Sequence, residues 1–360
     1  MNIFYHQILI YRLIRIVKLK MDYTIDRIKG CIFGGAIGDA FGAPFEFSSR
    51  LRIKERFGGK VTDFVDAPSV FGDKGSFTDD TEMALCIVDA IIEDRDVVPE
   101  TVVKHFIKWY EDGPTDIGLL TRQILHSLKM GVSWKKAARD VWLAEGGDNP
   151  NMNPRASNGS LMRCAPIGVF RYNDISQLVE DSIIISQTTH YDPRCCYSNV
   201  IHNYLISENI RRGNGPDNIE LAPIDYTQKI HWIMDKIILN NSPRLTKCVD
   251  AIIKKINQFK SNQKTFEEIS HDYYDKGGYV LDSLSISLIS FCCTTSFDES
   301  VIEATNFGSD NDTTGAINGA LAGSYYGYSN IPATWLQKLQ NKHVLEEKTN
   351  KLIEIMSPKA

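Results

Sequence analysis

Two segments of the chain repeat glycine at every fourth residue, with mostly Ala, Ile, Leu and Phe among the residues between. These glycines are Gly30, Gly34, Gly38 and Gly42, followed much later by Gly315, Gly319, Gly323 and Gly327. Glycine destabilises a helix interior by about 1 kcal/mol relative to alanine, so several in one helix need a packing reason. Residues four apart share one helix face, and a face without side chains lets another backbone approach closely. We therefore predict central, closely packed helices near 30–42 and 315–327, although two glycine-rich loops are the alternative.

The remaining pattern predicts a single, nearly all-helical domain. Helical stripes of apolar residues occur at 24–43, 101–111, 117–129, 134–143, 175–187, 198–210, 281–292 and 298–305, whereas the alternation typical of strands is scarce. The composition, 43% hydrophobic and 24% charged over 360 residues, is ordinary for a globular protein. Length alone allows two domains, but single domains of this size exist.

The ends of the chain are predicted to lie outside the domain. Residues 1–20 contain Arg12, Arg15, Lys18 and Lys20 and no acid. The interrupted apolar residues do not predict a membrane span. We expect a poorly ordered extension, with a basic amphipathic arm as the alternative. The domain is then expected at 21–345 and a tail at 346–360.

Charge and cysteine usage narrow the class of protein. The net charge of -5 argues against a nucleic-acid binder, which normally carries a basic excess. None of the eight cysteines forms a C-x-x-C pair, so a zinc site is not expected. Their spacing suits buried thiols in a reducing compartment, and we expect an intracellular, cytoplasmic monomer.

An acidic cluster precedes the second glycine series. Asp310 and Asp312 are followed by Thr313 and Thr314, where we expect a helix to begin. One interpretation is an acidic helix cap, but two carboxylates exceed what a cap requires. Oxygen ligands of this kind suit Mg²⁺ or Ca²⁺. A calcium EF-hand would place Leu321 where a bidentate carboxylate is needed, and that interpretation fails.

A second acidic cluster strengthens the metal interpretation. Thr78, a candidate cap, precedes Asp79, Asp80 and Thr81 at the start of another apolar stripe. One such pattern is common at helix starts, whereas two helix starts that each carry a pair of aspartates indicate a shared site. A phosphatase of the D-x-D-x-T kind would need a hydrophobic strand before Asp310, where the sequence is typical of a loop.

With these motifs assembled, the chain resembles the ADP-ribosylglycohydrolase family over residues 24–340. The resemblance rests on Gly34-Gly-Ala-Ile-Gly-Asp39-Ala-Phe-Gly-Ala-Pro-Phe-Glu46, Thr78-Asp-Asp-Thr81, Asn158-Gly-Ser-Leu-Met-Arg163-Cys-Ala-Pro166, Thr189-His190 and Gly308-Ser-Asp310-Asn-Asp312-Thr-Thr-Gly315. Ser309 stands where the family usually has glycine.

The resemblance implies one orthogonal all-α bundle with a central binuclear site for two Mg²⁺ ions, with Mn²⁺ as a substitute. The metal ligands it implies are Thr78, Asp79, Asp80, Asp310, Asp312 and Thr313. Glu46 would lie beside the metals, and Glu46 or Asp310 would act as acid or base. The ADP-ribose site it implies consists of Ser157, Asn158, Gly159, Ser160, Met162, His190 and Tyr279.

The expected activity is hydrolysis of the glycosidic bond between ADP-ribose and a protein side chain or a small conjugate, through an oxocarbenium-like transition state. A catalytically inactive ADP-ribose-binding or structural protein on the same fold is the alternative. An intact ligand set argues against it, because a structural role needs no such cluster of carboxylates. The phosphatase interpretation comes third.

Overall fold

The computed structural model describes residues 2–66, 73–147, 149, 151–212, 226–238, 243–273 and 277–357. Within these ranges the chain forms helices and turns without any strand, and two isolated bridges, Ser49–Gly308 and Ser157–Tyr279, are its β-type pairings. The prediction of an all-helical protein is therefore confirmed.

The helices follow one another along the chain. The first eight are α1 (Asn2–Gly42), α2 (Arg50–Phe57), α3 (Asp79–Asp94), α4 (Pro99–Asp112), α5 (Leu119–Lys129), α6 (Trp134–Ala144), α7 (Ala165–Phe170) and α8 (Ile175–Gln187). The others are α9 (Pro193–Arg211), α10 (Tyr226–Ile233), α11 (Pro243–Lys260), α12 (Phe266–Ser270), α13 (Val280–Cys292), α14 (Phe297–Thr305), α15 (Asn311–Tyr326), α16 (Ala333–Lys338) and α17 (Lys342–Met356). Shorter helical turns are η1 (Ala43–Phe45), η2 (Asn158–Ser160), η3 (Met234–Ile238), η4 (His271–Tyr273) and η5 (Tyr328–Asn330).

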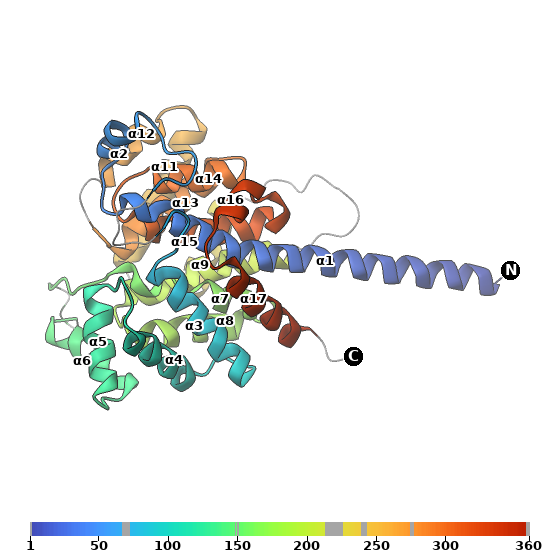
Figure 1. Cartoon of the computed structure of the whole chain (residues 1–360), viewed down its shortest axis with the longest axis horizontal. Helices are drawn as coiled ribbons and strands as arrows, with labels where there is room; N and C mark the ends of the chain where they lie inside the picture. The colour runs from blue at the N-terminus through green and yellow to red at the C-terminus, as the bar shows by residue number, and fades with distance from the viewer. Residues whose placement is uncertain are drawn as a thin grey trace.

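The antiparallel contact between α1 and α15 lies at the centre of the molecule (Figure 1). A Cβ atom added to Gly38 would overlap the carbonyl oxygen of Gly315, and one added to Gly34 would overlap that of Gly319. The same holds at Gly30 against Gly323. The two backbones therefore touch directly, as the glycine spacing predicts.

Helix α15 begins earlier than the sequence suggested. We expected the start at Thr313 or Thr314, but the helix begins at Asn311 with Asp310 at its N-cap. The Asn311 side chain donates hydrogen bonds to the carbonyl oxygens of Phe45 (2.5 Å) and Ser48 (3.2 Å). A contact with the turn after α1 therefore holds Asn311 in place, and local sequence does not reveal such a contact.

The described residues of the two predicted terminal segments are helical up to Met356. Residues 2–20 continue α1, and this end of the helix projects from the body of the molecule (Figure 1). The predicted boundary at 345 falls inside α17, where Thr349 and Leu352 are buried beyond it. Whether residues 1–20 are dispensable stays a prediction.

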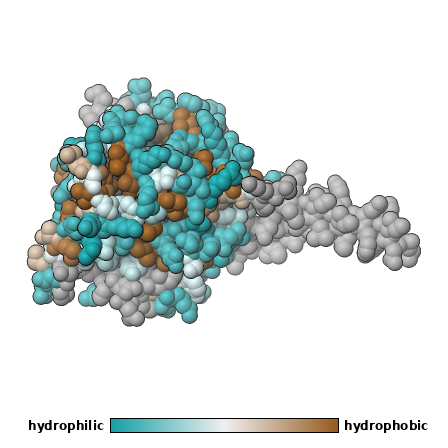
Figure 2. Space-filling model, turned by 90° about the horizontal axis from the view of Figure 1, so that it is seen from below, coloured by the Kyte–Doolittle hydropathy of each residue, from teal (hydrophilic) through white to brown (hydrophobic). Residues whose placement is uncertain are grey.

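The polarity of the surface and the free cysteines are as expected from the sequence composition. On the face shown in Figure 2, hydrophobic residues form separate patches among hydrophilic ones. In the described part of the chain, no helix has the length and apolarity that crossing a membrane requires. All eight cysteines lie in the described part and are free thiols, five of them buried.

The close approach of α1 and α15 can be tested with two glycines on α1. Gly38→Ala should lower the free energy of unfolding by about 1–3 kcal/mol or more, because its methyl group would overlap Gly315. Gly35→Ala is the matched control, since its Cβ would meet Ala320 and Ala316 at ordinary distances of 3.5 and 3.6 Å. Chemical denaturation measures both, and equal stability in the two variants would contradict the arrangement.

Candidate active site

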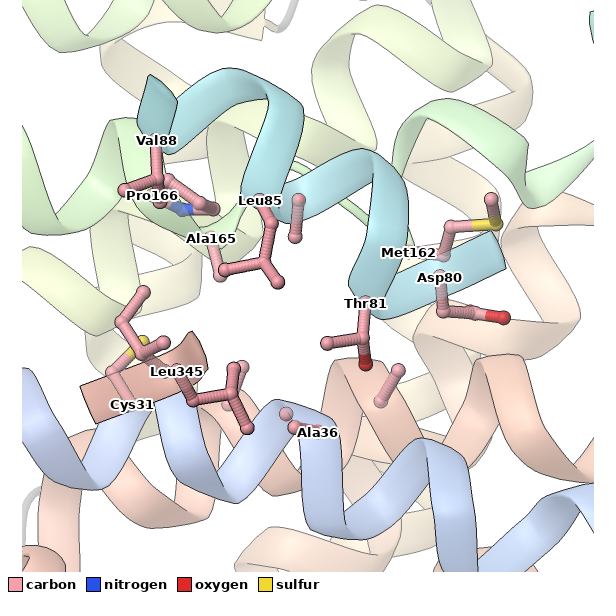
Figure 3. Close-up of a pocket in the computed structure, with 15 residues that line it drawn as sticks. Cys31, Ala36, Asp80, Thr81, Leu85, Val88, Met162, Ala165, Pro166 and Leu345 are labelled. Atoms are coloured by element: carbon pink, nitrogen blue, oxygen red, sulfur yellow. The ribbon is translucent and has the colours of Figure 1, made fainter. Parts of the chain in front are cut away.

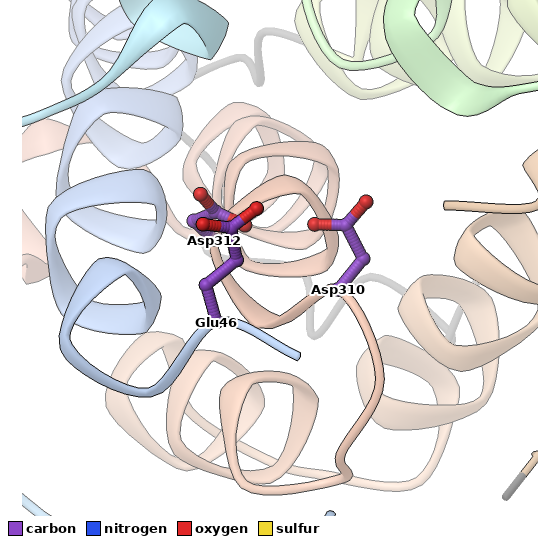
Figure 4. A group of neighbouring side chains, drawn as sticks. All are labelled: Glu46, Asp310 and Asp312. Atoms are coloured by element: carbon purple, nitrogen blue, oxygen red, sulfur yellow. The ribbon is translucent and has the colours of Figure 1, made fainter. Parts of the chain in front are cut away.

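Three carboxylates converge where α1 ends and α15 begins. Glu46 follows the turn η1, Asp310 is the N-cap of α15, and Asp312 lies in its first turn. Each offers an oxygen within 4.8 Å of the other two, and the three side chains face the same space (Figure 4). The antiparallel packing of α1 and α15 brings Glu46 to the two aspartates, although more than 260 positions separate it from them in sequence.

The start of α3 lies beside this cluster. Asp79 and Asp80 fall in the first turn of α3, as predicted, and both are buried. Neither aspartate belongs to the group of carboxylates whose oxygens lie within 4.8 Å of one another, which is Glu46, Asp310 and Asp312. Thr78 occupies the N-cap position, but its hydroxyl donates to Asp39 Oδ1 (2.9 Å) and Asp80 Oδ2 (3.1 Å) rather than accepting from its own helix.

Asp39, on α1, supplies the cap that α3 lacks. Its carboxylate accepts hydrogen bonds from the backbone N–H groups of Thr78 (3.0 Å) and Thr81 (3.1 Å). It also accepts from the hydroxyls of Thr78 (2.9 Å) and Thr81 (2.5 Å). Complete burial raises the pKa of Asp39 to about 7, although these four donors favour the charged form. Asp39 thereby fixes the position of Asp79 and Asp80 relative to α1.

The carboxylates of the site oppose one another's ionisation. Burial raises the pKa of Glu46 to about 9, and neighbouring Asp310 adds to the increase. Burial also raises the pKa values of Asp79, Asp80 and Asp312 well above their ordinary range, with further contributions from Asp116, Asp39 and Asp310 respectively. Nearby positive charge would reverse these shifts.

The environment of Asp80 fits a bound cation. Its Oδ1 is buried and has no hydrogen-bond partner, whereas buried carboxylate oxygens are normally paired or coordinate metals. Asp80 also borders a small cavity of about 30 Å³, otherwise lined mainly by apolar residues such as Leu85, Ala165 and Leu345 (Figure 3). Oxygen donors in this number suit Mg²⁺ or Mn²⁺.

A pocket of about 590 Å³ opens onto the carboxylates. Its acidic end contains Glu46, Asp79, Asp116, Asp310, Asp312 and Thr313. The remaining wall is lined by Phe47, Ile117, Gly118, Leu119, Leu120, Thr121, Arg155, Ala156, Ser157, Asn158, Gly159, Met162, Gly278 and Tyr279. Asn158 joins the two parts, because its Nδ2 donates to Asp310 Oδ2 (2.9 Å).

Most residues expected at the ADP-ribose site line this pocket, and two lie behind its wall. Ser157, Asn158, Gly159, Met162 and Tyr279 are lining residues. The buried ring of His190 lies behind them, with Nε2 2.9 Å from Ser157 Oγ and Nδ1 2.8 Å from Thr189 Oγ1. Burial lowers the pKa of His190 well below its usual value, so the ring is neutral at physiological pH. The Ser160 hydroxyl is also buried and accepts from Ser186 (3.0 Å).

Ser309, at the position of the usual glycine, adopts a left-handed backbone conformation with φ +84°. A serine is strained there. Its hydroxyl donates to the carbonyl oxygen of Gly277 (3.2 Å), which connects the loop of Asp310 to the segment that precedes Tyr279. The segment before Asp310 consists of α14 and a turn, so the strand that a D-x-D-x-T phosphatase requires is not there.

Sequence reasoning missed two acidic residues of the site. Asp39 belongs to a helix rich in glycine, and nothing local indicates that its partner is the start of α3. Asp116 is a single acid in the turn between α4 and α5, which is ordinarily a solvated position. It lines the same pocket as the clustered carboxylates, and its charge contributes to the raised pKa of Asp79.

The comparisons with known proteins agree with this geometry. The family model of ADP-ribosylglycohydrolase matches residues 20–359, and the chain belongs to that family. It is accordingly a glycosidase that hydrolyses linkages to ADP-ribose.

Relatives are similar over most of their length. The chain is 29% identical to ADP-ribosylarginine hydrolase Tri1 of Serratia proteamaculans (strain 568), with 92% of this chain and 79% of the relative covered. It is 24% identical to ADP-ribosyl-[dinitrogen reductase] glycohydrolase of Rhodospirillum rubrum, with 88% and 91% covered. A solved structure described as an ADP-ribosylglycohydrolase-related protein complex has the same fold, with a TM-score of 0.68, 23% identity and coverage of 93% and 100%.

The role of Asp39 can be tested by replacing its carboxylate. Asp39→Asn leaves one acceptor oxygen for four donors and should lower the free energy of unfolding by about 1–3 kcal/mol. The control is Asp89→Asn, farther along α3, where the half-buried side chain pairs with Lys348. Loss of this ion pair should lower the free energy of unfolding by less than about 1 kcal/mol. If urea denaturation showed that both variants lose the same free energy of unfolding, the proposed capping of α3 by Asp39 would be contradicted.

Proposed function

We propose that the chain is a divalent-metal-dependent hydrolase that releases ADP-ribose from arginine side chains of modified proteins. The observation that carries this proposal is the carboxylate cluster of Glu46, Asp310 and Asp312 at one end of a pocket large enough for a nucleotide-sized ligand. A non-catalytic role on this fold would have no use for an unpaired buried oxygen at Asp80.

The wall and the acidic end of the pocket suit different parts of an ADP-ribosylated substrate. Arg155 is a cationic side chain in the wall, beside the small residues Ser157 and Gly159. Such a wall suits a diphosphate, because backbone N–H groups and an arginine can both approach anionic oxygens. The ribose to be cleaved would then extend toward the acidic end.

The charge at the acidic end favours a cationic leaving group. Among the described residues, five carboxylates line it, namely Glu46, Asp79, Asp116, Asp310 and Asp312, and Asp80 is close enough to interact with Asp79 and Asp310. With Glu46 protonated as the acid, two divalent cations would neutralise four of the five negative charges that remain. Among the described lining residues Arg155 is the one cation, and we place it in the wall, against the diphosphate, rather than at the acidic end. The remaining negative charge suits a guanidinium. This preference agrees with the name of one relative, ADP-ribosylarginine hydrolase Tri1.

Glu46 is placed to transfer protons. It is half-buried at the edge of the pocket, where burial and the neighbouring Asp310 raise its pKa to about 9 when no cation is bound. We assign it as the donor to the leaving guanidine nitrogen as the C1′–N bond breaks. Water then supplies hydroxide to C1′, and its released proton restores the Glu46 carboxyl.

The carboxylates of α3 and α15 would hold the cations. Asp79, Asp80, Asp310 and Asp312, with the threonines that flank them, present only oxygen donors. When bound, the cations would supply positive charge that binds ribose hydroxyls and orients the attacking water. Asn158 would keep Asp310 in place through its 2.9 Å hydrogen bond.

Metal dependence predicts a linked change in stability and activity. Mg²⁺ at about a hundred times its dissociation constant should stabilise the wild type by roughly 2.7 kcal/mol. Asp310→Ala should abolish hydrolysis and remove most of that stabilisation, because it deletes a ligand. Thermal unfolding with Mg²⁺ or with chelator measures the first effect, and release of ADP-ribose measures the second. Full activity of the chelated enzyme would contradict the metal mechanism.

The arginine assignment predicts a selective effect at Asp116. Asp116→Asn should lower kcat/KM for ADP-ribosylarginine about tenfold, which corresponds to roughly 1.4 kcal/mol of lost attraction for the guanidinium. Peptides that carry ADP-ribose on arginine or on serine provide the comparison, with and without Mg²⁺. Preferred hydrolysis of the serine-linked peptide by the wild type would refute the assignment.

A further inference from the structure

Helix α2 is basic although the chain is acidic. Its eight residues include four cations, Arg50, Arg52, Lys54 and Arg56, and one acid, Glu55. The net charge of the whole chain is -5. Arg52, Lys54 and Arg56 are exposed, and the buried face of the helix is formed by Ile53.

The acids near α2 only partly compensate these cations. Arg50 (3.5 Å) and Lys60 both pair with the single carboxylate of Glu303. Lys54 lies 3.9 Å from Glu267, farther than a hydrogen bond. Within the described residues, neither Arg52 nor Arg56 forms an ion pair with a carboxylate. The surface of α2 therefore has a local positive excess.

The surface of α2 is fixed next to the active site. Ser49, the N-cap of α2, forms a backbone bridge with Gly308, two residues before Asp310. A second pocket, of about 280 Å³, lies at this junction and includes Arg50, Lys54 and His271 in its lining. Its other lining residues are Ser49, Leu51, Glu267, Ser270, Phe307, Gly308 and Ser309. The basic surface and the catalytic pocket thus both border the loop that carries Asp310.

Two large apolar side chains accompany the cations. Phe47, which lines the catalytic pocket, is 56% exposed, and Leu51, on α2, is 54% exposed. Phe47 also has a positive φ of 53°. Phe47 therefore connects the edge of the catalytic pocket to the start of α2.

We propose that α2 and the turn before it bind an acidic polypeptide segment of the ADP-ribosylated protein, next to its modified side chain. The inference rests on the proposed function, because it assumes that the ADP-ribose is attached to a protein. Charge complementarity identifies an anionic partner. The exposed Phe47 and Leu51 match a polypeptide better than a phosphate backbone.

The test compares peptides that differ only beside the modified arginine. One carries ADP-ribosylarginine followed by a run of glutamates, and the other carries glutamines instead. The wild type should hydrolyse the glutamate peptide with a kcat/KM roughly fivefold higher, as expected for two surface ion pairs. The variant Arg52→Gln/Lys54→Gln should lose this preference and act normally on the glutamine peptide.

The matched control is Lys136→Gln/Arg139→Gln, which removes two exposed cations from α6. It should keep the preference, and salt should reduce the preference in the wild type and in this control. An α2 variant that keeps the preference, or one that is impaired equally on both peptides, would overturn the proposal.

A binding experiment separates this proposal from the proposed function. A fluorescent, unmodified glutamate peptide should bind the wild type more tightly than the α2 variant even if no peptide is hydrolysed. Loss of hydrolysis with retained binding would contradict only the catalytic assignment. Absence of a difference in peptide binding, or stronger α2-dependent binding of a single-stranded oligonucleotide, would overturn the acidic-polypeptide assignment.

Discussion

The direct backbone contact between α1 and α15 is the interaction on which the site depends. At Gly34 and Gly38 the opposing carbonyl oxygens occupy the space that a Cβ atom would need. Because the helices are antiparallel, this contact places the end of α1 against the start of α15. Glu46 and Asp310 are therefore close in space as a consequence of how two glycine-rich helices pack.

The site concentrates negative charge at the amino-terminal ends of two helices. The dipoles of α3 and α15 favour anionic groups there, and Asp39 caps α3 from a different helix. These interactions stabilise single carboxylates, but burial first and mutual repulsion second still raise the pKa values of Glu46 and Asp312. Bound cations would relieve that repulsion, so metal binding and folding are expected to be coupled.

Under the proposed function, the catalytic pocket and the surface of α2 would recognise different parts of a modified protein. The catalytic pocket would then take the ADP-ribose and its acidic end a guanidinium. Helix α2 borders the same loop, which carries Asp310, and has the opposite charge. A substrate with acidic residues near a modified arginine would therefore meet complementary charge in both places.

The sequence by itself determined the helical class and the chemistry of the acidic clusters. Periodicity predicted α8 with its observed ends, and glycines spaced by four residues predicted a close helix contact, because both signals depend on local geometry. Tertiary structure decided the start of α15 through Asn311, and it brought Asp39 and Asp116 into the site. Those three residues act through partners far away in sequence, in the turn after α1, at the start of α3 and in the carboxylate cluster. Only the packing of helices places such partners together, so no local pattern could predict them.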